Sequence, residues 1–162
     1  MDKNFSILLV CTGNTCRSPM AAGILKKMLA EGGISDINVD SAGTAALEGM
    51  PATELAVKTS AEWGIDISGH RARPVTDELV EKADLILTMT PEHREEILLH
   101  DPTAAGKTFL LKSFPEPVKD DPFFYVRDPI GGGPADYQRS FFEIEESLRR
   151  IFSSILQRAG KR

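Results

Sequence analysis

The sequence predicts a single α/β domain built on a parallel sheet with helices on both faces. Short, continuously apolar segments alternate along the chain with segments of helical periodicity, and no repeat or low-complexity segment interrupts them. Apolar strands of this kind are typical of sheets that are buried on both faces, and right-handed crossovers restrict the topology to doubly wound orders. Because 162 residues suffice for one hydrophobic core, we expect residues 1–162 to form one domain.

The elements follow from local signals. Apolar segments predict the strands, with the first one central. Ser18 and Pro19 predict the N-cap and first residue of a helix that ends before Gly32, and Thr90-Pro91 predicts the start of another. The predicted strands are 5–10, 37–41, 85–89 and 108–112, and the predicted helices before the last one are 19–31, 51–63, 76–83 and one from residue 91.

The last third of the chain divides into a loop and a long helix. Residues 114–134 hold five of the ten prolines and a run of three glycines, so they predict an irregular segment and a candidate active-site wall. An apolar stripe at steps of three and four then predicts a long amphipathic helix facing the core. The stripe consists of Tyr137, Phe141, Ile144, Leu148, Ile151 and Ile155.

Composition and charge restrict the function classes. The formal charge of -5 argues against general attraction to nucleic acid or membranes. The apolar segment near the N-terminus is too short to span a membrane, and no cleavage-site pattern follows it, so we expect a cytoplasmic protein without nucleic-acid or membrane partners. In a reducing cytosol the two cysteines, Cys11 and Cys16, favour thiol chemistry over a structural disulfide.

The loop after the first strand, CTGNTCRSP at 11–19, favours an anion. Cys11 and Arg17 form the pattern C-x5-R ahead of a helix N-terminus, where backbone N–H groups, the helix dipole and the guanidinium can converge on phosphate oxygens. Gly13 lets the chain turn tightly. The same environment favours the nucleophilic thiolate of Cys11, which predicts a phosphatase nucleophile. The alternative is that Cys11 is a small buried hydrophobe and Arg17 a surface charge.

Two other readings of this loop lack support. The nucleotide-binding pattern G-x-x-x-x-G-K-[ST] is absent, and no lysine lies in the turn. Zinc binding by Cys11 and Cys16 would need further ligands, but His70, His93 and His100 have no suitable spacing. We therefore expect no metal and no cofactor.

The segment CTGNTCRSP resembles the signature C-x-G-N-x-C-R-S-P of the low-molecular-weight protein tyrosine phosphatase family. Further matches are SAGT at 41–44, HRAR at 70–73, ADLILTM at 83–89 and Asp128-Pro129. The resemblance implies a four-stranded parallel sheet in the order 2-1-3-4 and a two-step mechanism through a phosphocysteine. We also expect a monomer.

The resemblance also implies a role for each site residue. Cys11 would be the nucleophile and Arg17 the clamp on the phosphate, while Asn14 would hold a strained turn and the Ser18 hydroxyl would donate to the Cys11 sulfur. Ser41 and His70 match residues that orient Asn14, although a lone histidine is often a loop or capping residue. The predicted phosphate-binding loop comprises Thr12, Gly13, Asn14, Thr15, Cys16 and Ser18.

A proton donor for the leaving group is expected in the proline-rich loop, where the candidates are Asp120, Asp121 and Asp128. Asp128 precedes Pro129 just before the last helix and matches the Asp-Pro of the family, so it is the predicted general acid and base. Asp121-Pro122 is the local competitor.

Three positions depart from the tyrosine-specific branch of the family. This chain has Thr15 in place of an aliphatic residue, Thr90 in place of an acidic one, and Ile130 with three glycines in place of aromatic residues. The combination resembles the protein arginine phosphatases of Gram-positive bacteria. A planar, cationic phosphoarginine guanidinium favours polar and acidic neighbours over apolar walls, so Thr15 and Asp128 would contact it. The expected substrates are arginine-phosphorylated proteins, and tyrosine phosphatase is the alternative.

Other classes are less well supported by the residues. Arsenate reductases share this loop but relay electrons through further cysteines, which this chain lacks. A Cys11–Cys16 disulfide would protect the nucleophile from overoxidation and add redox regulation. A non-catalytic module that binds phosphoproteins would need the loop but neither Cys11 nor Asp128.

Overall fold

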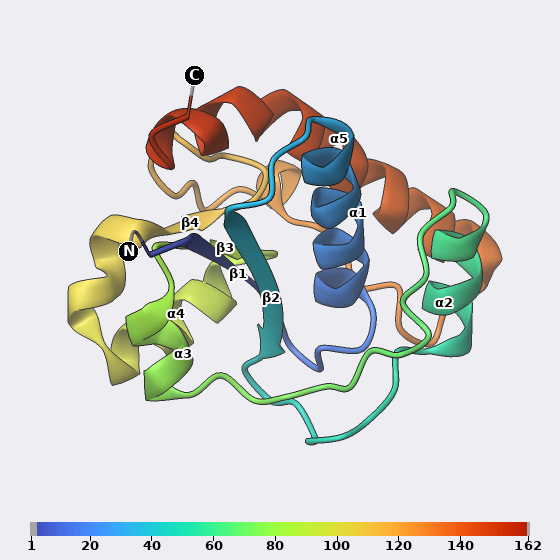
Figure 1. The fold of residues 1–162 in the computed structure, drawn as a ribbon. Helices are drawn as coiled ribbons and strands as arrows, with labels where there is room; N and C mark the ends of the chain where they lie inside the picture. The colour runs from blue at the N-terminus through green and yellow to red at the C-terminus, as the bar shows by residue number, and fades with distance from the viewer. Residues whose placement is uncertain (1–2, 162) are drawn as a thin grey trace.

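The computed structural model describes residues 3–161 and contains one sheet of four parallel strands (Figure 1). The strands lie in the order β2-β1-β3-β4, so the predicted order is confirmed. They are β1 (Phe5–Cys11), β2 (Ile37–Gly43), β3 (Leu85–Thr88) and β4 (Thr108–Leu110). The helices are α1 (Arg17–Glu31), α2 (Glu54–Ala61), α3 (Asp77–Lys82), α4 (Pro91–His100) and α5 (Pro134–Arg158), with short 3-10 helices η1 (Pro102–Lys107) and η2 (Pro122–Phe124).

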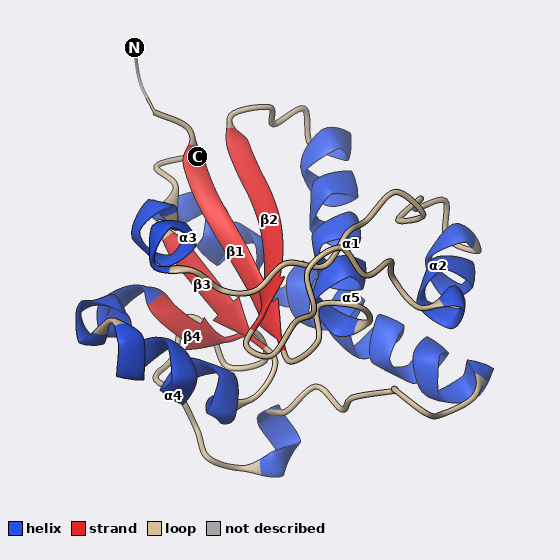
Figure 2. Ribbon diagram, turned by 90° about the horizontal axis from the view of Figure 1, so that it is seen from below, coloured by secondary structure: helices blue, strands red, loops and turns tan. Residues whose placement is uncertain are grey.

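The sheet separates two helical layers. Helices α1, α2 and α5 lie on one side, and α3 and α4 lie on the other (Figures 1 and 2). Strand β1 serves both layers, because Ile7 and Leu9 join the core beneath α1 and α5, whereas Leu8 and Val10 join the core beneath α3 and α4. The alternation of side chains along a strand therefore explains why residues 5–10 read as a continuous apolar run.

Helix α5 is the amphipathic helix that the sequence predicts. All six residues of the predicted stripe are buried, and the helix packs against α1 and α2. Each aliphatic side chain buried in this way contributes about 1.5–3 kcal/mol. Helix α5 thereby fixes the position of its own N-terminus, which follows the proline-rich loop.

Several predicted boundaries are wrong. Ser18 is not the N-cap of α1, which is Cys16, because the Ser18 hydroxyl bonds to the Cys11 sulfur and to Asn14 instead. The helix predicted over 51–63 begins at Glu54, because Pro51 pairs with Arg71 in an isolated bridge. The strand predicted over 37–41 continues to Gly43, and the one predicted over 108–112 ends at Leu110 in a turn.

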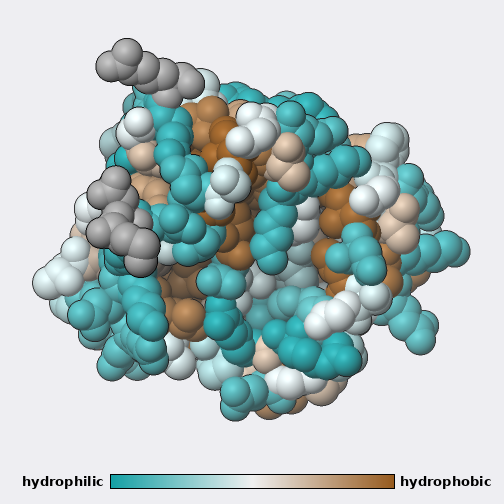
Figure 3. Space-filling model, viewed as in Figure 1, coloured by the Kyte–Doolittle hydropathy of each residue, from teal (hydrophilic) through white to brown (hydrophobic). Residues whose placement is uncertain are grey.

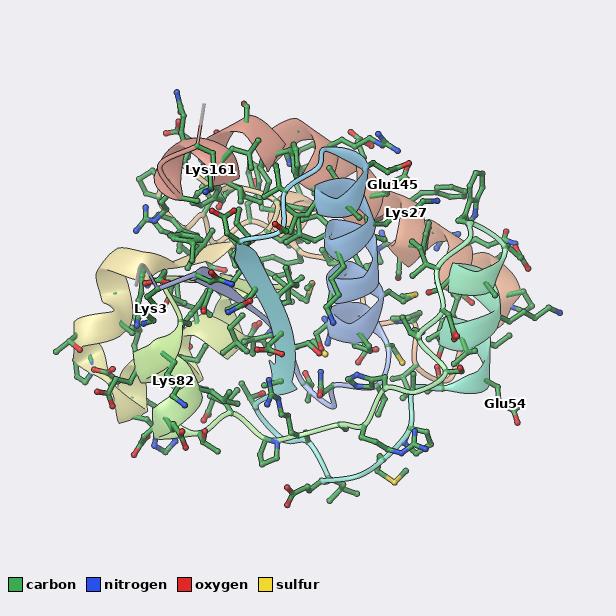
Figure 4. All side chains as sticks on the ribbon, viewed as in Figure 1. Lys3, Lys27, Glu54, Lys82, Glu145 and Lys161 are labelled. Carbon is green, nitrogen blue, oxygen red and sulfur yellow. The ribbon has the colours of Figure 1, made fainter. Side chains whose placement is uncertain are left out.

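The surface of the molecule is mixed, with hydrophilic and apolar residues on the same face (Figure 3). On the face seen in Figure 3, apolar residues form separate patches between hydrophilic ones, and the labelled Glu54 and Lys82 extend outward in Figure 4. Within residues 3–161, no helix is long and apolar enough to cross a membrane. Segment 114–134 is irregular as predicted, apart from η2 and the first residue of α5.

The carboxyl ends of β1 and β2 lie very close to the loop that follows β1. Gly43 is paired with Cys11 in the parallel ladder. A Cβ atom on Gly43 would lie 2.3 Å from the Thr12 carbonyl oxygen and 2.9 Å from the Asn14 nitrogen. Because both of these atoms belong to the backbone, the loop can seat against β2 only if residue 43 has no side chain.

We expect Gly43→Ala to lower the free energy of unfolding by about 1–3 kcal/mol, the usual effect of an added methyl group in a packed site. Denaturant unfolding measures this change. Gly106→Ala is the matched control, since a Cβ atom there meets nothing within 4 Å. Equal stability of the two variants would show that the loop can move away from β2.

Candidate active site

Residues 12–16 form a loop between β1 and α1, at the carboxyl ends of the strands (Figure 2). Neighbouring segments hold its carbonyl groups: the Ala45 N–H donates to Thr12 at 2.9 Å, and the Thr53 N–H donates to Thr15 at 3.0 Å. Within residues 3–161, no protein acceptor pairs with the backbone N–H groups of residues 13–16. The loop therefore presents donors to a bound anion, next to the N-terminus of α1.

Cys11 is the last residue of β1 and its side chain is buried. Its sulfur lies 2.9 Å from the Ser18 hydroxyl oxygen. Ser18 is fully buried in the first turn of α1, so the hydroxyl is held in place and can donate to the sulfur. The structure thus brings together the two residues that the sequence analysis paired.

Asn14 is the strained point of the loop. Its φ of 56° makes it the one non-glycine residue with positive φ among residues 3–161, a conformation that costs on the order of 1 kcal/mol. Its buried side chain donates to the hydroxyl groups of Ser18 (2.8 Å) and Ser41 (2.9 Å) and accepts from the Arg73 backbone N–H (2.9 Å). These three hydrogen bonds use every bonding group of the amide except one lone pair, and they fix the turn.

His70 supports the same turn from the backbone side. Its Nε2 donates to the Asn14 carbonyl oxygen at 2.7 Å. Burial lowers the pKa of His70, and although this hydrogen bond opposes the shift, nearby Lys26, Arg71 and Arg73 lower the pKa further. The predicted neighbours of Asn14, Ser41 and His70, are therefore both in contact with it.

The side chain of Arg17 is buried, and two of its guanidinium nitrogens donate hydrogen bonds to protein oxygens. The guanidinium donates from Nη1 to the Val126 carbonyl (3.0 Å) and from Nη2 to the Thr12 hydroxyl (3.3 Å). Its Nε–H is buried and has no protein acceptor within residues 3–161. A guanidinium held in this way keeps donors available for an oxygen of a bound phosphate.

Asp128 is the aspartate of the proline-rich loop that lies beside this guanidinium. One of its carboxylate oxygens is 3.4 Å from Arg17 Nη2, and the other accepts from the Ile130 backbone N–H. The two competitors have other partners, since Asp121 accepts from the Phe123 N–H at the start of η2 and Asp120 accepts from the Tyr125 hydroxyl. The structure thus places only Asp128 of these three aspartates at the loop.

The other two loop residues contact the wall made by α2 and α5. Thr15 is half-buried, and its hydroxyl lies 3.8 Å from the Cys16 sulfur. The Cys16 sulfur lies 3.3 Å from the Tyr137 hydroxyl, which itself accepts from the Thr53 hydroxyl at 3.0 Å. Burial, with the contact to Cys16, raises the pKa of Tyr137 to about 12. Both cysteines are free thiols.

Sequence reasoning missed three side chains at this site: Tyr137, Thr53 and His93. Tyr137 and Thr53 were read only as a core residue and part of a helix. His93 is buried, and its Nε2 lies 2.9 Å from the Thr12 hydroxyl. The capping-box pattern has glutamate or glutamine three residues after the cap, so the sequence did not point to a contact of His93 with Thr90 or with Thr12. No group of three or more His, Cys, Asp or Glu residues in the described chain could hold a metal ion.

The chain is similar to known proteins over most of its length. The family profile described as low molecular weight phosphotyrosine protein phosphatase matches residues 6–161. A protein-arginine-phosphatase of Bacillus subtilis is 39% identical over 145 residues, which are 90% of this chain and 93% of the relative. A probable low molecular weight protein-tyrosine-phosphatase, EpsP, of Ralstonia solanacearum is 44% identical over 118 residues, or 73% of this chain and 78% of the relative.

Solved structures agree with the sequence relatives. The YwlE arginine phosphatase of Geobacillus stearothermophilus superposes with a TM-score of 0.83 at 35% identity and covers 94% of both chains. A mutant of YwlE arginine phosphatase with a phosphorylated active-site serine superposes with a TM-score of 0.84 at 37% identity, over 94% of this chain and 96% of that one. The chain therefore belongs to the low molecular weight phosphotyrosine protein phosphatase family and is a cysteine-dependent protein phosphatase.

Proposed function

We propose that this protein is a protein arginine phosphatase that hydrolyses phosphoarginine in proteins. The observation that carries the proposal is the wall next to Asp128. Residues 129–133 supply no aromatic ring there: Pro129 is followed by Ile130, which is 59% exposed, and by three glycines. Residues 129–132 line a cavity of about 300 Å³ together with Asp128, Asp136 and Arg139, and no aromatic side chain lines this cavity.

The comparisons support this proposal without excluding the alternative. Relatives named as arginine phosphatases match nine tenths of the chain, and a relative named as a probable tyrosine phosphatase matches the same share of it. Phosphotyrosine is therefore the alternative substrate. A phosphotyrosine ring would gain most from stacking partners, whereas a guanidinium gains from acceptors such as Asp128 and the Thr15 hydroxyl.

In the first step of the proposed reaction, the Cys11 thiolate attacks phosphorus and the bond between phosphorus and the arginine nitrogen breaks. The Asp128 carboxyl group donates a proton to the departing nitrogen. Arg17 and the N–H groups of residues 13–16 bind the phosphoryl oxygens and stabilise the charge that they carry in the transition state. The products are an unmodified arginine side chain of the substrate protein and a phosphocysteine on Cys11.

In the second step, the Asp128 carboxylate takes a proton from a water molecule, whose oxygen attacks phosphorus. The bond between phosphorus and the Cys11 sulfur breaks, and inorganic phosphate forms. The Ser18 hydroxyl, 2.9 Å from the sulfur, donates to the departing thiolate and makes it a better leaving group. Asn14, Ser41 and His70 act indirectly, because they hold the turn on which the N–H donors depend.

Regulation by oxidation of Cys11 and Cys16 is part of the proposal. An oxidant such as peroxide would convert the Cys11 thiolate to a sulfenic acid, and the Cys16 thiol would displace water from it to form a disulfide. Both thiols are buried, Cys11 at the end of β1 and Cys16 at the end of the loop that follows. The disulfide would block the nucleophile reversibly.

Replacing Cys11 with serine separates an enzyme from a module that only binds phosphoproteins. We expect Cys11→Ser to lose turnover of phosphoarginine completely while it still binds inorganic phosphate, because the donors of the loop remain. Turnover is measured with a phosphoarginine peptide and binding by calorimetry. A wild-type protein that binds the peptide without hydrolysing it would instead support the module.

The role of Asp128 is tested by Asp128→Asn, which keeps the shape of the side chain but cannot exchange the proton. We expect kcat to fall by about 100-fold or more, the usual contribution of a general acid. Asp121→Asn is the matched control in the same loop and is expected to keep the wild-type rate. The opposite pattern would assign the proton transfer to Asp121.

Substrate choice is tested at Thr15. The ratio of kcat/KM for phosphoarginine to that for phosphotyrosine is compared in the wild type, Thr15→Val and Thr15→Ile. We expect the ratio to fall about tenfold in Thr15→Val, which loses one hydrogen bond at constant shape, and further in Thr15→Ile. An unchanged ratio in both variants would show that Thr15 does not select the substrate.

A further inference from the structure

His93 is a buried histidine that the proposed reaction does not use. It lies in the first turn of α4, on the opposite layer from α1, and it is 4% exposed. Its two ring nitrogens have different partners: Nδ1 is 3.1 Å from the Thr90 backbone nitrogen, and Nε2 is 2.9 Å from the Thr12 hydroxyl oxygen. The ring thus connects the N-cap of α4 to the phosphate-binding loop.

The contact with Thr90 determines which ring nitrogen carries the proton. A backbone N–H can only donate, so Nδ1 must accept and must be unprotonated. In the neutral ring the hydrogen is therefore on Nε2, which donates to the Thr12 hydroxyl. Burial and the neighbouring charge of Arg17 lower the pKa of His93 to about 4, so the ring is neutral at neutral pH.

Thr12 is the residue through which this arrangement reaches the reaction site. Its hydroxyl oxygen accepts from His93 Nε2 and also from Arg17 Nη2, at 3.3 Å. With both lone pairs of the oxygen occupied, the hydroxyl can act toward a third group only as a donor. The site for such an acceptor is next to the Arg17 guanidinium, where a phosphate oxygen would bind.

We propose that His93 is a positioning residue that fixes the Thr12 hydroxyl as a hydrogen-bond donor to the phosphate. The contact between Thr90 and His93 at the cap of α4 thereby determines that the Thr12 hydroxyl donates, and does not accept, in its hydrogen bond to the phosphate. The inference rests on the phosphate binding proposed for this loop and is independent of the choice between phosphoarginine and phosphotyrosine.

The chain allows a matched pair of variants. In His93→Gln, the amide oxygen can accept from Thr90 and the amide nitrogen can donate to Thr12, as the imidazole does. In His93→Glu, the carboxylate can accept from Thr90 but can no longer donate, so the Thr12 hydroxyl must turn its hydrogen toward residue 93. Glutamine and glutamate both suit this third helical position as capping residues, so the cap of α4 is kept in both.

The enzymes are compared by turnover of p-nitrophenyl phosphate, inhibition by inorganic phosphate and melting temperature. We expect His93→Gln to keep kcat/KM within about threefold of the wild type. We expect His93→Glu to lower kcat/KM and weaken phosphate inhibition by about tenfold or more, the effect of a lost hydrogen bond at a charged group. Equal kinetics of the two variants would overturn the inference.

A double-mutant cycle distinguishes positioning from simple charge repulsion by glutamate. In a Thr12→Val background, the difference between the Gln and Glu variants is expected to shrink to less than about threefold, because the coupled hydroxyl is gone. A difference that persists in full would overturn the role of Thr12. If the wild type turns over neither p-nitrophenyl phosphate nor phosphoarginine, the proposed function fails before this inference is reached.

The Thr12 variants give a second measurement that does not depend on the folding of His93→Glu. We expect Thr12→Val to weaken phosphate inhibition while Thr12→Ser retains it, since only serine can donate to the phosphate. Unchanged inhibition in Thr12→Val would also overturn the inference.

Discussion

The whole site depends on the left-handed turn at Asn14. The conformation turns the loop so that its carbonyl groups meet neighbouring segments and its N–H groups remain available to a ligand. The turn is maintained from distant parts of the sequence, by Ser18 on α1, Ser41 on β2 and the segment that contains His70 and Arg73. Buried hydrogen bonds therefore stabilise an unfavourable backbone geometry. This geometry preorganises the backbone N–H donors before a phosphate binds.

The two layers of the fold contribute to the site in different ways. The layer of α1 and α5 supplies Arg17, Ser18 and Tyr137, whereas the layer of α4 supplies His93. The loop after β1 lies where both layers reach the same end of the sheet, so it can be braced from both. This position is the crevice in which doubly wound sheets bind their ligands.

Local patterns in the sequence were sufficient for most of the fold. Local strand patterns predicted all four strands, and the stripe from Tyr137 to Ile155 predicted the buried face of α5. The errors arose where a tertiary contact replaced a local preference. Serine is a preferred N-cap residue, but the Ser18 hydroxyl forms hydrogen bonds with Cys11 and Asn14 instead. Pro51 lies outside the helix because it pairs with Arg71 in an isolated bridge.

The candidate site was predictable only where its residues are close in sequence or match the family's motif. Cys11, Asn14, Arg17 and Ser18 lie within one short segment, and Asp128 was found by its Asp-Pro motif. His93 and Tyr137 reach the loop from residues that are about 80 and 120 positions away, and no periodicity or spacing rule encodes such a contact. The sequence shows His93, but it does not indicate that His93 contacts Thr12.

The absence of a side chain at Gly43 has a further consequence for how the site can diversify. The underside of the phosphate-binding loop is in direct backbone contact with the end of β2, which leaves no room for a larger residue there. The segment after Asp128 is open at two positions, since Ile130 is exposed and a Cβ atom on Gly133 would meet nothing within 4 Å, whereas Gly131 has a positive φ and a Cβ atom on Gly132 would lie 2.5 Å from Asp136. A chain with this architecture can therefore acquire a new substrate by substitution at its rim while its phosphate chemistry stays fixed from below.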